Sequence, residues 1–595
     1  MTASKQKNQK ENNKAVDSNL IRRLYVYLKP YKWYLVLALV ITLLASFLGP
    51  LRPYLVQIAI DDYIATEDIP GLGQIVLLFF FILLFESVLM IGTTYLTRWI
   101  GQNALHSLRN AVFNKIQKLH VQFFDRNPIG RLITRTTNDI EALSDLLSSG
   151  VVNIIGDIFR IVFILIFMFS LSWELTIVSI STLPFLFYAT FWFKAKVRVA
   201  FLNVRDQIAR LNSFVQEHIN GMSVVQLFGR EKKEAERFRQ LNMDHTKAHI
   251  RTIFYFAIFW PAVEVLSSLA MALVIWYGGA SALGGGLTFG ILVAFIQYVR
   301  LFFLPIRDLS DKFNTLQSAL ASSERIFNVM DTENVVKEAD NPVNLTKING
   351  NIEFRNVTFR YNEDEEEILK NISFTVKPGE TVAVVGATGA GKTTLINLIT
   401  RFYDIQSGEI LIDGHNIKEL SLKNLRTCFG LVLQDNALFS GSIYDNITLG
   451  NSEISLEKVK RAAELVEANR FIEKLPGTYN YVLQERGASL SMGQRQLLCF
   501  VRAMVFNPSI LVLDEATSNI DSETESLVVK ATQTLLKGRT SIIIAHRLAT
   551  IQHADKIIVM HKGQIRETGT HQELLKKKDG IYRKLYELQY KEQAA

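Results

Sequence analysis

One short stretch limits most strongly what this chain can fold into. Residues 384–394 read Val-Val-Gly-Ala-Thr-Gly-Ala-Gly-Lys-Thr-Thr. The apolar run Thr381–Val385 predicts a strand leading into it, and Leu395–Ile399 predicts a helix leading out of it. The pattern Gly-x4-Gly-Lys-Thr between a strand and a helix is a phosphate-binding P-loop. The sequence therefore predicts that the chain binds a nucleoside triphosphate.

Each residue type in the P-loop has a chemical reason to be there. Glycines let successive backbone N–H groups turn inward around phosphate oxygens. The helix N-terminus adds a partial positive charge, and Lys392 adds a full one near the β- and γ-phosphates. The Thr393 hydroxyl is placed to bind Mg²⁺. The residues expected to contact the nucleotide here are Gly386, Ala387, Thr388, Gly389, Ala390, Gly391, Lys392, Thr393 and Thr394.

A second apolar strand supplies the acidic residues that hydrolysis needs. Ile510–Leu513 precedes Asp514 and Glu515. The end of a buried strand places Asp514 where the Mg²⁺ shell needs an oxygen ligand. Glu515 is expected to polarise a water for attack on the γ-phosphate. Alone such a strand is a weak signal, but together with the P-loop it indicates a nucleotide hydrolase.

Length and charge restrict the remaining possibilities. With 595 residues the chain is too long for one core, and its apolar excess lies in the first half. The net charge of +8 could suggest nucleic acid. Because the basic residues flank apolar runs, a membrane surface is the better partner, and we expect no nucleic acid. Cys428 and Cys499 suit a reducing cytosol and offer no metal-ligand spacing.

Six charge-poor runs predict membrane-spanning helices. Residues 1–19 are expected to be a disordered cytoplasmic tail, and Leu20–Tyr31 reads as an amphipathic helix on the membrane or a plain surface helix. The spans are expected at about residues 33–51, 74–99, 151–173, 175–193, 252–277 and 287–304. Two carboxylates, Glu86 and Glu264, lie inside spans, where each should face the bundle interior or water.

The distribution of basic residues orients the spans. Residues 59–73, 171–174 and 278–286 contain no Lys or Arg, whereas 101–150 and 194–251 contain many. The basic segments are therefore expected in the cytoplasm, with both termini. Their helical periodicity predicts that the spans continue as rigid extensions, with turns at Asp125–Pro128 and near Leu211–Gly221. We thus expect a six-helix transmembrane domain at 20–310, a linker at 311–350 and an α/β P-loop nucleotide-binding domain at 351–595.

Three motifs together resemble the ATP-binding-cassette (ABC) family. They are the P-loop, Leu490-Ser491-Met492-Gly493-Gln494 before a predicted helix, and Ala545-His546-Arg547. In the second motif Ser491, Gly493 and Gln494 form a further anion site at a helix start. The six preceding spans narrow the resemblance to ABC exporters, over about residues 20–590. It implies a multi-pass protein of the cytoplasmic membrane, with its cassette in the cytoplasm and ATP and Mg²⁺ as cofactors.

The resemblance assigns further residue roles. Tyr361 resembles the aromatic residue that stacks on adenine, and Gln434 the glutamine that contacts Mg²⁺ and senses the membrane domain. His546 resembles the switch histidine at the γ-phosphate. Asp521 resembles a residue of the loop that connects the two nucleotide sites. Glu485–Gly487 resembles the segment that touches the cytoplasmic extensions. Family members act as two cassettes closed head-to-tail, so this chain is half of a transporter.

One position departs from the family pattern. The signature is Leu-Ser-Gly-Gly-Gln, and this chain has Met492 at the first glycine. A side chain there obstructs the close approach of backbone to phosphate that glycine permits. This chain nevertheless keeps the family's residues at the catalytic positions, which are Lys392, Asp514, Glu515 and His546. This division resembles the catalytic-site-bearing half of heterodimeric bacterial exporters, so we expect a different second half-transporter as partner.

The expected function is ATP-driven export of a small amphiphile, either drug-like or lipid. The alternatives are an ATP-gated channel or regulator with the same fold, and a homodimeric lipid flippase; a soluble P-loop ATPase is excluded by the spans. Glu264 is a candidate contact for a cationic substrate or a paired structural carboxylate. Aromatic residues suggest an apolar cavity or lipid-facing packing, and they are Phe254, Phe256, Phe259, Trp260, Phe295 and Tyr298.

Overall fold

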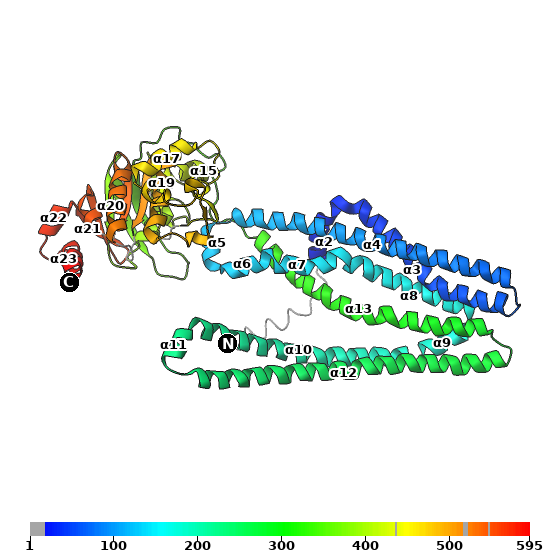
Figure 1. Cartoon of the computed structure of the whole chain (residues 1–595). Coiled ribbons are helices and arrows are strands. Elements are labelled where there is room, and N and C mark those ends of the chain that lie inside the picture. Colours follow the sequence, from blue (N-terminus) through cyan, green and yellow to red (C-terminus); the bar gives the residue numbers. More distant parts are fainter. Residues whose placement is uncertain (1–17, 435–436, 516–521, 546–547, 595) are drawn as a thin grey trace. The chain divides into compact units, whose positions relative to one another are not determined.

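The computed structural model describes residues 18–434, 437–515, 522–545 and 548–594. It divides into two compact units (Figure 1). The helical unit consists of Met1–Lys118 and Ile129–Thr332, and the cassette unit consists of Leu119–Pro128 and Glu333–Ala595. A short piece of the first half of the chain thus belongs to the cassette unit.

The helical unit contains long helices and short connecting turns. They are α2 Ser18–Leu28, η2 Lys29–Tyr31, α3 Lys32–Ile58, η3 Ala59–Ile64, α4 Ile69–Gln117, α6 Ile129–Thr136, α7 Asn138–Asp145, η4 Leu146–Gly150, α8 Val151–Leu171, α9 Trp173–Ile180, α10 Leu183–Asn220, α11 Met222–Leu227, α12 Glu231–Leu283 and α13 Phe289–Met330. Within the described residues, five helical segments are long and apolar enough to cross a membrane. A sixth, shorter apolar segment is Phe289–Pro305 in α13.

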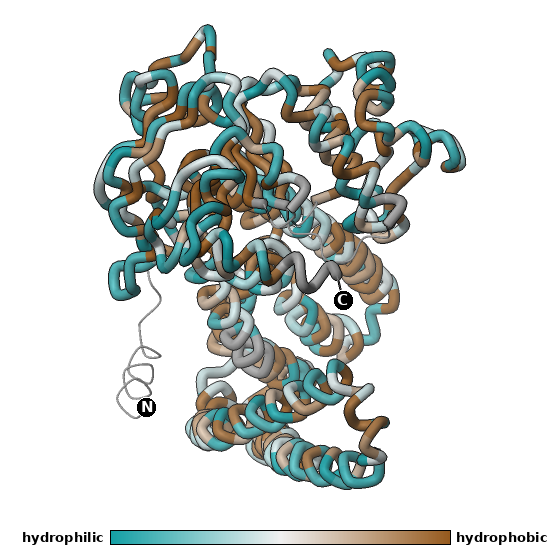
Figure 2. Tube along the Cα trace, turned by 90° about the vertical axis from the view of Figure 1, so that its left-hand side faces the viewer, coloured by the Kyte–Doolittle hydropathy of each residue, from teal (hydrophilic) through white to brown (hydrophobic). Residues whose placement is uncertain are grey.

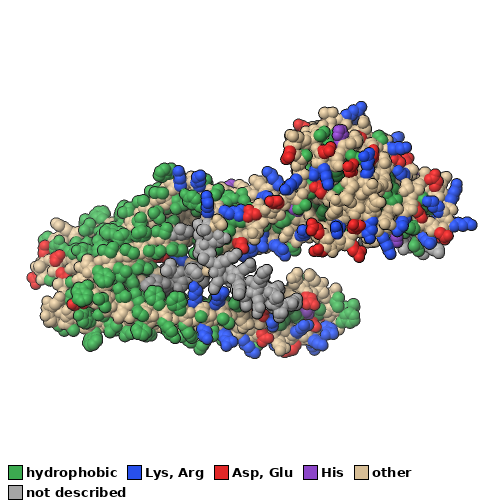
Figure 3. Space-filling view, turned by 180° about the vertical axis from the view of Figure 1, so that it is seen from behind, with side chains coloured by type: hydrophobic (Ala, Val, Ile, Leu, Met, Phe, Trp, Pro, Cys, Tyr) green, Lys and Arg blue, Asp and Glu red, His purple; other side chains and the backbone are tan. Residues whose placement is uncertain are grey.

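Hydrophobic side chains on the surface of the helical unit mark the expected bilayer region. They gather over the parts of the long helices that carry the predicted spans, whereas basic side chains cluster on the predicted cytoplasmic extensions (Figure 3). The hydropathy along the backbone shows hydrophobic stretches in the helices of this unit (Figure 2). The segment Ile69–Gln117 is the most exposed, since none of its most apolar window is buried in this chain. Such exposed apolar surface is stable only in lipid or against another subunit.

Polar caps begin the helices at the ends predicted to lie outside the cell. Asp68 accepts a hydrogen bond from the Gly71 N–H (3.0 Å) at the start of α4, and Ser172 accepts one from Leu175 (3.3 Å) at the start of α9. Thr288 does the same for Ile291 (3.4 Å) at the start of α13. Each cap satisfies an N–H that the helix itself leaves unpaired. The tight hairpin expected at residues 171–174 is present between α8 and α9.

Both predicted cytoplasmic turns differ from the expectation. Residues 121–126 form the short helix α5, so Asp125 and Arg126 end a helix instead of forming a turn. Leu211–Asn220 is the end of α10, and the reversal lies at Gly221–Arg230 around α11. Leu211–Asn220 continues the helical pattern of α10, and Gly221 is the first residue outside it. The fourth span is also interrupted, at Ser181–Thr182 between α9 and α10.

The core of the helical unit is built from aromatic and aliphatic side chains of α8, α12 and α13. Phe295 and Tyr298 have no exposed surface and pack with Ile164, Met168 and Val274. The Tyr298 hydroxyl donates a hydrogen bond to the Pro50 carbonyl oxygen (2.8 Å), so its polar end is satisfied inside the bundle. Phe295 and Tyr298 are therefore core residues, so neither a cavity lining nor lipid-facing packing describes them.

A buried carboxylate holds the C-terminal part of α13 against α7. The Asp139 side chain is 6% exposed and binds Arg135 (2.6 Å) and the Nε of Arg325 (3.2 Å). Burial alone would raise the pKa of Asp139, but the hydrogen bonds from Arg325 and Arg135 outweigh it and lower the pKa. The carboxylate is thus charged at neutral pH, and its two cations are held by it.

We predict that Asp139→Ala destabilises the helical unit by about 3 kcal/mol, because two arginines lose their buried counter-charge. Thermal unfolding in detergent measures this as a lower melting temperature. The lowered pKa means that the stabilising contribution is present above the ordinary value of 3.8 and is lost as the pH falls below it. Glu236→Gln, which alters an exposed pair with Arg239, is the control and should change little. An equal effect of both variants would contradict the assignment.

The cassette unit is an α/β fold around two larger sheets. Its helices are α5 Val121–Arg126, α14 Lys392–Ile399, α15 Leu422–Thr427, α16 Ile443–Thr448, α17 Leu456–Leu465, α18 Asn469–Ile472, α19 Met492–Phe506, α20 Ser522–Leu536, α21 Leu548–Gln552, α22 His571–Lys576 and α23 Ile581–Ala594, with 3-10 turns η5 Thr478–Asn480 and η6 Glu485–Gly487. Its strands are β1 Ile352–Phe359, β2 Leu369–Val376, β3 Thr381–Val385, β4 Ser407–Ile412, β5 His415–Asn416, β6 Phe429–Val432, β7 Gly441–Ser442, β8 Val482–Leu483, β9 Ile510–Glu515, β10 Thr540–Ala545, β11 Lys556–His561 and β12 Gln564–Gly569.

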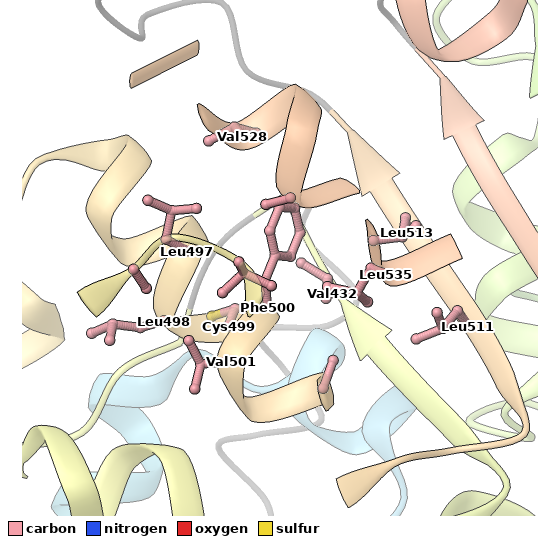
Figure 4. Close-up of a cluster of buried hydrophobic side chains, with 14 of the residues drawn as sticks. Val432, Leu497, Leu498, Cys499, Phe500, Val501, Leu511, Leu513, Val528 and Leu535 are labelled. Carbon is pink, nitrogen blue, oxygen red and sulfur yellow. The ribbon is translucent and has the colours of Figure 1, made fainter. Parts of the chain in front are cut away.

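The central sheet has the strand order β12-β11-β3-β10-β9-β6, and all neighbours pair in parallel except β11 and β12. Its strands are apolar on both faces. Leu511 and Leu513 pack on one side with Phe500 of α19 and Val528 and Leu535 of α20 (Figure 4), whereas alternate residues of the same strand pack on the other. Burial on both faces explains why these strands read as continuous apolar runs.

Candidate nucleotide site

The P-loop connects β3 to α14, as the sequence predicts. Two of its glycines are required by geometry. Gly386 has φ +157°, and a Cβ there would lie 2.3 Å from the Met560 carbonyl oxygen. Gly391 caps α14 with φ +99°, and a Cβ would lie 2.6 Å from the Leu369 side chain. Neither position has room for a side chain, so the loop conformation depends on both.

Lys392 is drawn into the loop from the first residue of α14. Its Nζ donates hydrogen bonds to the carbonyl oxygens of Gly386 (2.8 Å) and Ala387 (3.2 Å), and the residue is 7% exposed. Burial lowers the pKa of Lys392, and the charge of Asp514 opposes that shift. A phosphate group placed at the loop would restore the preference for the charged form. The ammonium group is therefore positioned for an anionic ligand.

The strand register brings Asp514 close to the P-loop. Ile544 of β10 pairs with Val384 of β3 on one side and with Asp514 of β9 on the other. The carboxyl ends of the three parallel strands therefore meet at one edge, with Asp514 two strands, or about 10 Å, from β3. Burial raises the pKa of Asp514, and the charge of Lys392 opposes the rise. The two groups stabilise each other's charged form across this edge.

The exposed parts of the loop face solvent. Ala387, Thr388 and Gly389 are exposed, and so is Thr393, whereas Thr394 is buried. Gln434 is exposed just beyond the end of β6, the strand next to β9. Hydroxyl, carboxylate and amide oxygens are thus available near the phosphate loop. This set of hard oxygen ligands fits Mg²⁺.

The signature motif begins helix α19. The Ser491 hydroxyl accepts a hydrogen bond from the Gln494 N–H (3.2 Å), and the Gln494 side-chain oxygen accepts one from the Ser491 N–H (3.0 Å). Met492 is the first helical residue and half-buried, whereas Gly493 is buried. Because Met492 does not have positive φ, the backbone itself does not require glycine there. The methionine side chain acts only by occupying space at the helix N-terminus.

Tyr361 lies beside α14. Its hydroxyl is 3.2 Å from Thr394 Oγ1 and accepts a hydrogen bond from Asn397 Nδ2 (3.2 Å). Its ring meets the rings of Phe359 and Tyr403 edge-on, with centroids 4.9 Å apart in both cases. The ring is half-buried and fixed in orientation. It is therefore held next to the P-loop helix by three separate elements.

Helix α5 contributes contacts that sequence analysis missed. Gln122 donates a hydrogen bond to the Tyr361 carbonyl oxygen (3.0 Å), and the Tyr403 hydroxyl donates one to Asp125. Arg126 also donates to the side-chain oxygen of Asn362. A six-residue helix is too short for a periodic signal. The only hint was Asn127-Pro128, which marks its end.

A buried amide near Asp514 was also missed. Gln496 of α19 is 4% exposed, and its side-chain oxygen has no hydrogen-bond partner among the described residues. It lines a small cavity of about 10 Å³ together with Asp514, Phe500 and Thr532. The cavity thus connects the signature helix to the acidic end of β9.

The side chains of three residues predicted to act at the site lie outside the described residues. Glu515 ends β9 and its backbone pairs with Ala545, but its side chain lies outside the described residues. His546 and Asp521 also lie outside them. Their roles remain predictions.

Comparisons with known proteins match both halves of the chain. The family model for the ABC transporter transmembrane region matches residues 35–306, and the ABC transporter family model matches residues 369–518. The uncharacterized ABC transporter ATP-binding protein YknV of Bacillus subtilis is 39% identical, covering 96% of this chain and 94% of that protein. An ATP-dependent lipid A-core flippase of Syntrophus aciditrophicus is 36% identical (98% and 96%).

A third relative is a putative multidrug export ATP-binding/permease protein of Staphylococcus aureus, which is 37% identical over 96% of this chain and 100% of its own length. These relatives span the helical and cassette units in one chain, as this protein does. Together with the P-loop, the acidic strand and the capped signature helix, they show that the chain belongs to the ABC transporter family, as an ATP-hydrolysing half-transporter of the exporter type.

Proposed function

We propose that this protein exports a small amphiphile, a drug-like compound or lipid, across the cytoplasmic membrane as one half of a heterodimeric exporter. The arrangement of the P-loop, Asp514 and α19 in one cassette supports ATP-driven work. The apolar helices continuous with cytoplasmic extensions support movement across the bilayer. ATP drives transport only if it binds the closed cassettes more tightly than the open ones.

The proposed site gives each group one task. Lys392 and the P-loop amides bind the β- and γ-phosphates, and Tyr361 offers its fixed ring to adenine. Mg²⁺ would be held by Thr393, Asp514 and Gln434 and would neutralise charge on the phosphates. We assign Glu515 as the base that takes a proton from the attacking water, and His546 as a contact to the γ-phosphate. The signature of the other cassette closes the site from the opposite side.

The heterodimer proposal rests on Met492. Its side chain stands at the first position of α19, where the helix N-terminus is the anion site. In a homodimer both nucleotide sites would face this methionine. In a heterodimer only the partner's nucleotide would face it, while this chain's Glu515 faces the partner's signature. Intact catalytic residues beside an altered signature favour the second arrangement.

Glu515→Gln should leave ATP binding intact and lower turnover by roughly 10²–10⁴-fold, the scale for losing a positioned base. It should also trap the closed dimer, since ATP stays uncleaved. Steady-state ATP hydrolysis by the complete complex measures the first effect, and trapping of a labelled nucleotide measures the second. Near-normal hydrolysis by the variant would remove Glu515 from the role of base.

Met492→Gly separates the two dimers. In the heterodimer the change should alter turnover only a few-fold, because it acts at the partner's site and supplies no base there. In a homodimer it should raise turnover substantially, because Met492 would then face both active P-loops. Ser491→Ala should cost little in the heterodimer and much in the homodimer. ATP hydrolysis and oligomeric state are compared for this chain alone and with its candidate partner; a fully active dimer of this chain alone would contradict the heterodimer.

Vectorial transport tests export itself. Purified complex in liposomes, with cassettes facing outward, should accumulate a fluorescent amphiphile when ATP and Mg²⁺ are added, and Glu515→Gln should abolish accumulation. A channel would instead give ATP-dependent ion conductance without accumulation, and a regulator would give no accumulation either. That second result would contradict the export proposal, whereas accumulation by this chain alone would favour a homodimeric flippase.

A further inference from the structure

Glu264 and Arg300 lie inside the predicted spans, and among the described residues they lack the ion pairs that other charged side chains of the helical unit make. Arg52 pairs with Glu86 (3.3 Å), and Lys312 pairs with Asp157. Glu264 of α12 and Arg300 of α13 are both exposed in this chain and make no ion pair or hydrogen bond with any described residue. Glu86 is thus a paired structural carboxylate, and Glu264 is not.

Lipid cannot surround these two charges. A charged group exposed to hydrocarbon costs several kcal/mol, so it faces protein or water. Since Glu264 and Arg300 are exposed in the single chain, water or the second half of the transporter has to cover them. Two other arginines in the predicted spans differ from them in position. The Nε of Arg160 is buried within this chain, and Arg98 lies at the cytoplasmic end of its span, within reach of water.

The two helices that carry these charges are packed antiparallel neighbours. A Cβ on Gly278 would lie 2.8 Å from Leu292, which fixes their relative level. Val263 and Ala270 of α12 share a core with Val299 and Phe302 of α13, so the packing extends along both spans. Glu264 precedes Gly278 by 14 residues and Arg300 follows Leu292 by only 8, so Glu264 lies about 9 Å nearer the cytoplasm. Two long side chains can bridge most of that distance.

The surroundings of Glu264 suit an organic cation. Trp260 precedes it by one helical turn and therefore lies on the same face. The Trp260 ring lies 5.7 Å from Phe259, which stacks on Phe193 of α10 at 4.1 Å. A carboxylate next to aromatic rings favours an alkylammonium group, and the ring cluster offers apolar surface for an acyl chain. Arg300 is a fork of N–H donors that matches a phosphate group.

We propose that Glu264 and Arg300 bind the two charges of one zwitterionic amphiphile, with its ammonium group at Glu264 and its phosphate group at Arg300. This inference rests on the proposed export function and narrows its substrate class to phospholipid-like molecules. A purely cationic amphiphile would leave Arg300 without a counter-charge. A purely anionic amphiphile would leave Glu264 without one. Burying either charge unpaired costs free energy, so both are bound less well than the zwitterion.

The test uses three fluorescent lipids with the same acyl chains in liposomes that contain the complete complex. One lipid carries phosphocholine, one phosphoglycerol and one only trimethylammonium, and ATP-dependent movement between leaflets is measured for each. Wild type should move the phosphocholine lipid fastest. Glu264→Gln should lower the rate for the phosphocholine lipid about tenfold, to the rate of the phosphoglycerol lipid or below it. Arg300→Gln should also lower the rate for the phosphocholine lipid about tenfold, to the rate of the trimethylammonium lipid or below it.

Matched controls change the same charges outside the bilayer. Glu236→Gln and Arg239→Gln lie on the cytoplasmic part of α12 in an exposed pair and should leave all three rates unchanged. Movement of lipids with the same order of preference in wild type and both span variants would overturn the zwitterion inference alone. Loss of movement of all three lipids in each span variant, with recovery in the double variant Glu264→Arg/Arg300→Glu, would also overturn it, because the two residues would then pair with each other and not with the lipid. No movement of any lipid or dye by wild type would instead contradict export.

Discussion

The in-register row of β3, β10 and β9 is the constraint on which the cassette depends. Val384, Ile544 and Asp514 are level across three parallel strands, so the P-loop and the acidic strand end at one edge without any side chain having to reach far. Both faces of this sheet are buried, and a slip of one residue would move each side chain out of its own core and into the opposite one. The chemistry of the site is therefore fixed by backbone hydrogen bonds and core packing.

The helical unit obeys a different constraint, which is the high free energy of charge in hydrocarbon. Several of its carboxylates are neutralised by a neighbour within the same chain, as Glu86 is by Arg52 and Asp157 by Lys312. This internal pairing makes the half a stable body before it meets its partner. The charges that remain uncompensated then mark where the surface is completed by something else.

Sequence alone predicted the elements that strong local signals define. The strand Thr381–Val385 has the predicted bounds and the P-loop follows it, whereas the signature helix begins at Met492, inside the motif that was expected to precede it. The spans were predictable because apolar runs of such length are typical of helices that cross a bilayer. The family comparisons confirm the exporter fold and its ATP hydrolysis.

What failed depended on tertiary contacts. Helix α5 is stabilised by Tyr361, Asn362 and Tyr403, which are more than 200 residues away. The end of α10 was misjudged because charge and apolar spacing continue smoothly through Leu211–Asn220. Phe295 and Tyr298 could not be distinguished from cavity residues, since burial by neighbouring helices leaves no mark on a single helix.

The membership of α5 in the cassette unit bears on how the protein is made and dissected. The ribosome synthesises this helix more than 200 residues before the segments it packs on. During translation, Val121, Gln122 and Asp125 therefore cannot form these contacts until those segments have been made. A cassette expressed by itself from residue 333 would never acquire them. Its Tyr361 carbonyl and Tyr403 hydroxyl would bind water instead, and the ring beside the P-loop would lose one of its supports. Nucleotide affinities measured on such a fragment would describe a differently assembled site.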